Sequence, residues 1–331
     1  MPPSSPYLSG ADRYERTMHG WVDCPDPEAF AMTVRIADPW VSIELVAATT
    51  PSPAYSMRGA RGRIIVGPPE RVDLGLPEAV AGLAGISMTA GFTRSVAAAL
   101  GNRAGAEYFT DAAVEVARLA RQVTRLPERL VKERTREGAV GFWRLDMEGW
   151  VDIPSSCYTY RPESLALFRE REVRSAAQPG LYCQPAGADR VFNRSKVARL
   201  ERRDGRLLLS HSMYDEVHSF QIWYAVDLAT GAILDAGSIT PRLPYLGICT
   251  DPQRTITALV GQTVDAELRK RIGRLIGGLS GCAQLYDLTA DLLKLLSFPG
   301  AGARPASSRF FGQVALEELP GVKVVEPDAL G

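Results

Sequence analysis

Asp215 and His218 are the side chains whose types and spacing most directly suggest chemistry. They lie three positions apart and directly precede a segment in which apolar and polar residues alternate, as in a half-buried strand. A carboxylate beside an imidazole can act as a general acid/base pair, because ordinary pKa values of about 3.9 and about 6.5 suit proton transfer near neutral pH. We predict that His218 is the catalytic acid or base and that Asp215 orients it. The alternative is a histidine at a strand edge beside an aspartate that closes a turn.

Cys249 and Cys282 add two thiols to this candidate site. Two thiolates and an imidazole can bind Zn²⁺ or iron, with Gln284 or a water as the fourth ligand. Zinc ligands usually come in closely spaced pairs, whereas these three residues are separated by 31 and 33 positions. We therefore expect no cofactor, with a divalent metal held by His218, Cys249 and Cys282 as the alternative. Without a metal, Cys282 is predicted to assist catalysis, and Cys249 and Gln284 to bind substrate.

Three further residues carry groups that suit a pocket for an organic molecule. Trp150 offers a flat apolar ring, Asp152 a carboxylate two positions later, and Tyr245 a hydroxyl group. We predict that Trp150 and Asp152 bind substrate and that Tyr245 donates a hydrogen bond during catalysis. The alternative is core packing for the tryptophan and the anchoring of a turn for the tyrosine.

The charge balance and the motifs that the sequence lacks exclude several classes of protein. The 38 basic and 38 acidic side chains leave a formal net charge of zero, so the chain has no broad positive field for nucleic acid or a membrane surface. The sequence contains no Gly-x-Gly-x-x-Gly, phosphate-loop, His-Glu-x-x-His or Gly-x-Ser-x-Gly motif. Dinucleotide oxidoreductases, phosphate-loop ATPases, zincins and α/β-hydrolases are therefore disfavoured.

The cysteines and the first residues bear on the cellular compartment. The five cysteines are odd in number, widely spread and free of Cys-x-x-Cys pairs, which favours reduced thiols over a disulfide framework. The chain starts Met-Pro-Pro-Ser-Ser-Pro without the basic and apolar regions of a signal peptide, and no apolar run approaches the ~20 residues of a membrane span. We expect a cytoplasmic protein with a small-molecule partner and with neither nucleic acid nor a membrane as partner.

Three blocks of matching residues indicate that one module occurs twice. Residues 18–25 match 147–154 at six of eight positions, and both contain Gly-Trp-Val-Asp. Residues 30–55 match 220–245 at an offset of 190, and residues 83–119 match 259–295 at an offset of 176. In this alignment the positions of His218, Cys249, Cys282 and Gln284 correspond in the first copy to Glu28, Gly59, Ala106 and Tyr108. We therefore expect the first copy to be degenerate and the second to hold the site.

Each copy is predicted to be an antiparallel sheet followed by a helical hairpin. Alternating apolar residues predict strands at 32–36 and 220–226, with a returning strand at 232–239. Helical spacing interrupted by glycines predicts paired helices at 92–100 and 109–119, and again at 268–276 and 285–295. A further hairpin is predicted around Asp204-Gly205, because Asp-Gly is typical of a two-residue turn. The predicted fold class is α+β with two tandem pseudo-symmetric repeats.

This organisation divides the chain into five segments. They are an N-terminal extension at 1–17, a first repeat at 18–124, a charged linker at 125–146, a second repeat at 147–298 with an inserted hairpin region at 155–217, and a Pro/Gly-rich tail at 299–331. Both ends are rich in proline with serine or glycine, so we expect partial disorder there. The fused copies are expected to form a pseudo-dimeric monomer or a homo-oligomer.

Several short motifs of the second copy carry a family resemblance. They are the stretch 146–152, His218, Asp227, Pro244-Tyr245 before Cys249, Leu259-Val260-Gly261, and Gly-Gly-Leu-Ser-Gly-Cys-Ala-Gln-Leu at 277–285; the first copy shares Gly91-Phe92 and Leu100-Gly101. In these residues the chain resembles a bacterial family, domain of unknown function 2889, and the resemblance implies two such domains in tandem. Gln284 stands where the family has a histidine, and Ser219 where it has an acidic residue.

Together these features predict a cytoplasmic enzyme that acts on a small organic substrate by acid/base chemistry without a nucleotide cofactor. An aromatic compound is one candidate for the substrate. A lyase, an isomerase or a hydrolase would fit, with the site in a cleft of the second repeat or between the repeats. The alternative is a non-catalytic binding or assembly protein that depends on a metal or on thiols and uses Cys249, Cys282 and His218.

Overall fold

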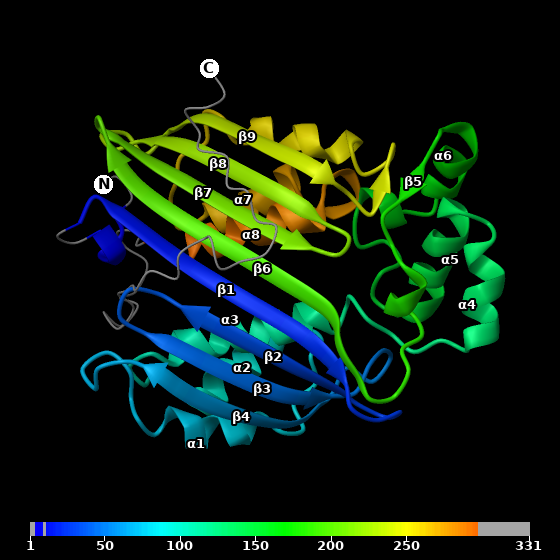
Figure 1. The fold of residues 1–331 in the computed structure, drawn as a ribbon. Coiled ribbons are helices and arrows are strands. Elements are labelled where there is room, and N and C mark those ends of the chain that lie inside the picture. Colours follow the sequence, from blue (N-terminus) through cyan, green and yellow to red (C-terminus); the bar gives the residue numbers. More distant parts are fainter. Residues whose placement is uncertain (1–3, 9–10, 297–331) are drawn as a thin grey trace.

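One eight-stranded antiparallel sheet forms the centre of the molecule (Figure 1). The computed structural model describes residues 4–8 and 11–296. The strands lie in the order β4-β3-β2-β1-β6-β7-β8-β9. Their bounds are β1 Arg13–Cys24, β2 Phe30–Ala37, β3 Ser42–Thr49, β4 Met57–Val66, β6 Ala188–Arg203, β7 Arg206–Asp215, β8 Ser219–Asp227 and β9 Ile233–Arg242. A separate two-stranded ladder pairs β5 (Arg174–Ser175) with β10 (Tyr245–Leu246). The predicted α+β class is confirmed.

The strands β1 and β6 form the central pair of the large sheet and join its two halves. Their antiparallel pairing runs from Arg13 opposite Glu201 to Val22 opposite Phe192. On either side, neighbouring strands are also consecutive in the sequence. The turn Asp204-Gly205 connects β6 to β7, and both of its residues have positive φ, which aspartate and glycine tolerate. The hairpin that this pair predicts is present, and it lies at the centre of the sheet.

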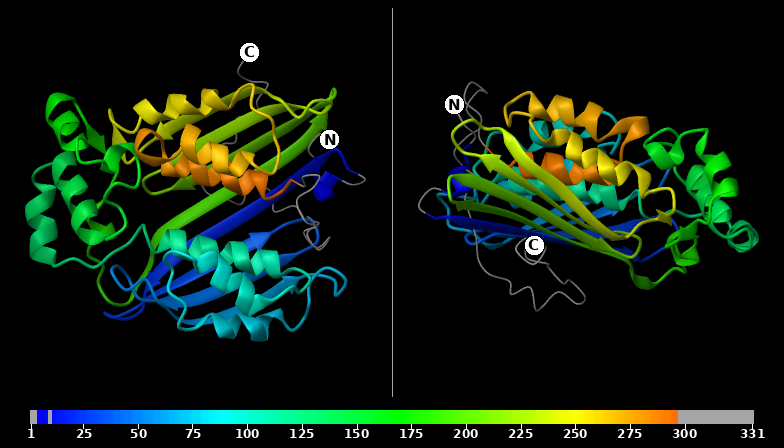
Figure 2. Two further views of the ribbon diagram at one scale, coloured as in Figure 1. Left: turned by 180° about the vertical axis from the view of Figure 1, so that it is seen from behind. Right: turned by 90° about the horizontal axis from the view of Figure 1, so that it is seen from above.

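Helices cover one face of the sheet (Figure 2). Their bounds are α1 Leu76–Val80, α2 Phe92–Leu100, α3 Ala106–Leu119, α4 Glu128–Thr135, α5 Ala139–Gly149, α6 Ser164–Glu170, α7 Leu268–Leu275 and α8 Ala283–Leu293, with 3₁₀ helices η1 Pro6–Leu8, η2 Ala81–Leu83, η3 Tyr158–Tyr160, η4 Pro179–Leu181, η5 Asp251–Leu259 and η6 Gly278–Ser280. The paired helices predicted in each half are present as α2 with α3 and α7 with α8.

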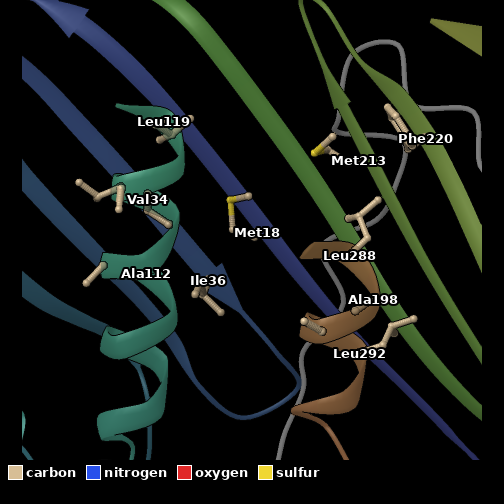
Figure 3. Packing of buried hydrophobic residues seen from close by; sticks show 14 of the residues in the cluster. Met18, Val34, Ile36, Ala112, Leu119, Ala198, Met213, Phe220, Leu288 and Leu292 are labelled. Atoms are coloured by element: carbon tan, nitrogen blue, oxygen red, sulfur yellow. The ribbon is translucent and has the colours of Figure 1, made fainter. Parts of the chain in front are cut away.

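The core lies between these helices and the alternate strand residues that point toward them. Helix α3 packs on β1, β2 and β3, while α8 packs on β7 and β8. Val34 and Leu119 are buried in the first half, and Phe220 and Leu288 in the second (Figure 3). Because side chains alternate across a strand, each sheet segment buries one apolar row and leaves its polar row on the other face.

Helices α4, α5 and α6 form a group to one side of the sheet (Figure 1). The segment at 125–146, predicted as a charged linker, contains α4 and most of α5. Trp143, Leu145 and Asp146 on α5 are buried. This part of the chain is therefore integrated in the fold and supplies a wall of the site described below.

The first two blocks of the proposed repeat do not align equivalent structures. Trp21 lies in strand β1, whereas Trp150 directly follows helix α5, so the same four letters adopt different conformations. The second block aligns β2, which is adjacent to β1, with β8, which is separated from β6 by β7. Only the third block aligns like with like, because it matches α2 with α7 and α3 with α8. Tertiary context overrides such short matches.

The described N-terminal residues contact the end of the described chain. Tyr7 and Leu8 in η1 are buried, and the Ser5 hydroxyl donates a hydrogen bond to the carbonyl oxygen of Leu295 over 2.8 Å. Since β1 begins at Arg13, the predicted boundary at residue 18 falls inside a strand. The predicted tail at 299–331 lies outside the described residues. Among the helices of the described ranges, none has the length and apolar character needed to cross a membrane.

Candidate functional site

One cavity brings together residues from five parts of the chain. It has a volume of about 130 Å³ and lies where residues 121–122 after α3, residues 146–182, the turn between β7 and β8, the segment after β9 and the start of α8 meet. Six of the eight predicted site residues line it, namely Trp150, His218, Tyr245, Cys249, Cys282 and Gln284. The cavity is thus built mainly by the second half of the sheet and by the segment before it.

Asp215 orients the imidazole of His218 from the turn between β7 and β8. Nδ1 of His218 lies 3.0 Å from Oδ1 of Asp215, and the backbone N–H groups of Val217 and His218 donate to the same oxygen over 2.9 and 2.7 Å. An aspartate that accepts two backbone hydrogen bonds in this way closes a tight turn. Asp215 therefore closes the turn and also holds the ring, although it does not itself line the cavity.

Arg194 on β6 keeps Asp215 ionised. Its Nε donates to Oδ2 of Asp215 over 2.8 Å, and neither side chain is more than 1% exposed. Burial alone would raise the pKa of Asp215, but His218 and Arg194 lower this pKa well below its usual range. An ionised carboxylate only accepts hydrogen bonds, so Nδ1 carries the proton in the neutral imidazole. Nε2 then keeps its lone pair, and within the described residues it makes no hydrogen bond.

A buried carboxylate from the first half, that of Glu115, supports this arrangement. Nη1 of Arg194 lies 3.5 Å from Oε1 of Glu115 on α3, and Nζ of Lys196 lies 2.6 Å from Oε2 of the same glutamate. These side chains are at most 4% exposed. Because a buried charge is costly unless it is paired, the network fixes α3 against β6 and keeps Arg194 beside Asp215.

Asp146 on α5 is a cavity residue that the sequence reasoning did not select. Its carboxyl group accepts hydrogen bonds from three tyrosine hydroxyls: Tyr182 to Oδ1 over 2.6 Å, Tyr160 to Oδ2 over 2.7 Å, and Tyr245 to Oδ2. Burial raises the pKa of Asp146 to about 6, and the tyrosine hydrogen bonds oppose this rise only in part. The carboxyl group can therefore exchange a proton near neutral pH.

The sequence does contain a signal that could have identified Asp146, namely its spacing from two tryptophans. Asp146 lies three residues after Trp143 and four before Trp150, which is the spacing of one helix face. An acidic residue on an otherwise apolar face indicates a buried carboxylate, and such groups often serve chemistry. Tyr160 and Tyr182 had no comparable signal, and although Tyr245 was predicted as a hydrogen-bond donor, nothing in the sequence connects it with Asp146, 99 positions away.

Three cysteines line the cavity, and burial favours the protonated form of their thiols. They are Cys249, Cys282 and Cys157, of which the last was not predicted. Burial raises the pKa of each, that of Cys282 to about 11, and the Sγ atom of Cys249 lies 3.1 Å from Oγ1 of Thr159. A metal ligand or a nucleophile must be a thiolate. Within residues 4–8 and 11–296, no group of three or more His, Cys, Asp or Glu side chains is placed to hold a metal ion.

Trp150 belongs to the aromatic wall of the cavity, whereas Asp152 does not reach it. The Trp150 ring meets Tyr182 edge to face at 5.6 Å, and its Nε1 donates to the carbonyl oxygen of Ala120 over 3.4 Å. Asp152 follows the end of α5, and its two carboxylate oxygens accept hydrogen bonds from the Tyr55 hydroxyl and from Nε of Arg121. Asp152 thus contacts the first half of the chain, and its role in substrate binding stays a prediction.

Comparison with known proteins adds one relationship. No curated protein and no solved structure matches the chain. One family model matches residues 198–296, a segment that carries His218, Tyr245, Cys249, Cys282 and Gln284 but not Asp146. In this segment the chain is similar to the family described as Protein of unknown function (DUF2889).

Proposed function

We propose that this protein is an enzyme that acts on a small organic substrate by general acid/base chemistry without a nucleotide cofactor. The observation that carries the proposal is that two proton-transfer groups with different environments line one cavity. Nε2 of His218 makes no hydrogen bond to any described residue, and Asp146 has a pKa of about 6. In enzymes, the general acid and the general base commonly lie in different environments that move their pKa values apart.

In this proposal His218 is the base and Asp146 the acid. Nε2 removes a proton from the substrate, and Asp215 balances the positive charge that develops on the ring. The protonated carboxyl group of Asp146 gives its proton to a second substrate atom, and the hydroxyl of Tyr245 stabilises the carboxylate that remains. The cycle closes when the proton on His218 passes through solvent to Asp146.

The substrate atom that receives the proton from Asp146 decides the type of reaction. A proton returned to another carbon gives an isomerisation, and a proton given to a leaving group gives an elimination, as in a lyase. If His218 deprotonates a water molecule, the result is a hydrolysis. Trp150, Cys249, Cys282 and Gln284 then act as walls and contacts for the substrate.

Proton exchange in D₂O tests this function. Purified protein is incubated with a panel of small cyclic ketones, alcohols and phenols, and deuterium incorporation and product formation are followed by NMR. We expect His218→Ala to lower the rate by about 10²- to 10⁴-fold, which is the usual contribution of a general base. His19→Ala is the matched control, because His19 lies in β1 and does not line the cavity. A reaction that is equally fast in His218→Ala would contradict the proposal.

We also propose that the chain contains two copies of one module, β1 to α3 and β6 to α8. Three observations support it. The strands follow the same order outward from the central pair in both halves. The isolated bridge between Ser56 and Ser87 has a counterpart, between Ala232 and Thr263, in which both partners lie 176 positions later. Each copy then continues into two paired helices.

The turn that holds His218 has a counterpart in the first copy. Asp38 begins the connection after β2, and its Oδ1 accepts a hydrogen bond from the backbone N–H of Val41 over 3.0 Å, as Asp215 does from His218. In this alignment Val41, and not Glu28, takes the place of the histidine. The first copy would thus keep the turn and lack the base, and the fused pair would form a pseudo-dimeric monomer.

A further inference from the structure

The size of the cavity limits what it can hold. Its volume of about 130 Å³ is close to that of an engineered cavity of about 150 Å³ in another protein, which binds benzene. Aromatic side chains, among them Trp150, Tyr160 and Phe220, form part of the wall. Flat apolar walls favour a flat apolar ligand, and the volume allows one ring.

The charged groups on the wall already have partners. The carboxyl group of Asp146 accepts hydrogen bonds from three tyrosine hydroxyl groups. The guanidinium group of Arg121 donates to Asp152 and to the carbonyl oxygens of Ala117 and Met88. His218 is paired with Asp215. The positive charge of a protonated ring would therefore be balanced by that carboxylate and would not be available to a bound anion. Within the described part of the chain, a carboxylate or phosphate in the cavity would find no unpaired cation, and burying it would be costly.

Two polar side chains on the wall offer complementary groups that make no hydrogen bond to another described residue. They are His218, whose Nε2 can accept a hydrogen bond, and Gln284 at the start of α8, whose amide can donate one. A hydroxyl group has the chemistry that both require, because it can donate its O–H to Nε2 and accept from the amide. A carbonyl oxygen would satisfy only the amide.

We infer that the cavity binds an uncharged single-ring compound that bears a hydroxyl group, of which phenol is the simplest. This inference rests on the proposed function, since the hydroxyl would lie against the base. The ring fills the apolar part of the cavity, and the hydroxyl contacts His218 and Gln284. Anionic ring compounds are disfavoured, because the cationic groups that the described residues place on the wall already have partners.

Binding of four probes of similar ring size tests the inference. Phenol, toluene, benzoate and phenyl phosphate are titrated into the full-length protein, and affinity is measured by calorimetry and by ligand-observed NMR. We expect phenol to bind about tenfold more tightly than toluene, the difference that one good hydrogen bond supplies, and the two anions to bind more weakly than toluene. Gln284→Ala should lower the phenol affinity toward that of toluene and leave toluene binding unchanged.

Binding and turnover separate this inference from the proposed function. Benzoate or phenyl phosphate binding as tightly as phenol, toluene binding as tightly as phenol, or no phenol binding at millimolar concentration would each overturn the inferred ligand class. A His218-dependent reaction on a charged substrate would overturn the ligand class and leave the function standing. Phenol binding that depends on Gln284, together with reactions that do not depend on His218, would support the ligand class and contradict the function. Unfolding curves of Gln284→Ala show whether the variant is folded.

Discussion

Asp215 accepts a hydrogen bond from Nε of Arg194 over 2.8 Å at a place where neither side chain is more than 1% exposed. The contact joins the turn that carries His218 to the central strand β6. It means that the orientation of the proposed base depends on an ion pair that water does not reach. Removing one partner leaves the other as a buried charge, so the pair has a measurable effect on stability as well as on chemistry.

Asp215→Ala should lower the free energy of unfolding by about 3 to 5 kcal/mol, because the Arg194 charge loses its main partner inside the protein. Asp215→Asn is the matched comparison, since an amide oxygen can still accept the backbone hydrogen bonds of the turn, and it should cost less. Urea unfolding monitored by circular dichroism measures both. If the alanine variant lost no more stability than the asparagine variant, the ion pair would not be a main support of the turn.

Asp146→Asn should change how stability depends on pH. The folded protein holds the Asp146 proton more tightly than the unfolded chain does, because the pKa is raised to about 6. Stability contributed by this group is therefore complete at low pH and falls as pH rises from about 4 to about 6. Asparagine does not titrate. Between about pH 4 and about pH 6, the free energy of unfolding of the variant should therefore rise relative to that of the wild type by up to about 3 kcal/mol. A stability difference that is independent of pH would contradict the raised pKa.

Tyr245→Phe should shift the pH dependence of the proposed reaction. The Tyr245 hydroxyl donates to Asp146 and stabilises its ionised form, so removing it raises the pKa of Asp146 further. If the protonated form is the acid, activity is lost as pH rises above this pKa, and the falling limb of the kcat profile should move to higher pH. Tyr224→Phe is the control, because its hydroxyl contacts Thr289 and not Asp146. An unchanged limb would show that Asp146 is not the acid.

Cys282 should react slowly with iodoacetamide at neutral pH. Burial raises the pKa of its thiol to about 11, so at pH 7 only a very small fraction is thiolate. The alkylation rate should rise about tenfold for each pH unit up to pH 9, well below this pKa. Labelling followed by peptide mass spectrometry measures it, with the same peptide in urea as the reference. Labelling in the folded protein as fast as in urea would contradict the raised pKa of this thiol.

The local elements of the fold were predictable because their signals lie close together in the sequence. Asp204-Gly205 predicted the β6–β7 hairpin, since few residue pairs tolerate positive φ at both turn positions. Helical spacing between glycines likewise predicted α2, α3, α7 and α8. The repeat alignment failed in its strand blocks, because alternating apolar residues resemble one another in every strand and only the hydrogen-bonded order distinguishes β7 from β8.

Most of the cavity residues that the sequence predicted come from one module. His218, Tyr245, Cys249, Cys282 and Gln284 line the cavity and lie after β7, whereas Trp150 lies before β6. Arg194 and Asp146 were missed, because each acts through partners that tertiary structure supplies. Glu115 lies 79 positions before Arg194, and Tyr182 lies 36 positions after Asp146. No spacing rule of a single sequence connects such pairs.

The pairing of β1 with β6 has a practical consequence for expressing residues 198–296, the segment that is similar to the family, as a separate fragment. That segment begins at residue 198, which lies in the middle of β6, opposite Arg16 of β1. A fragment cut there would expose a row of unpaired backbone amide and carbonyl groups along a truncated strand. Exposed strand edges of this kind pair with other molecules and promote aggregation. Aggregation of the excised piece should therefore be expected, and it would say nothing about the chemistry of the intact protein.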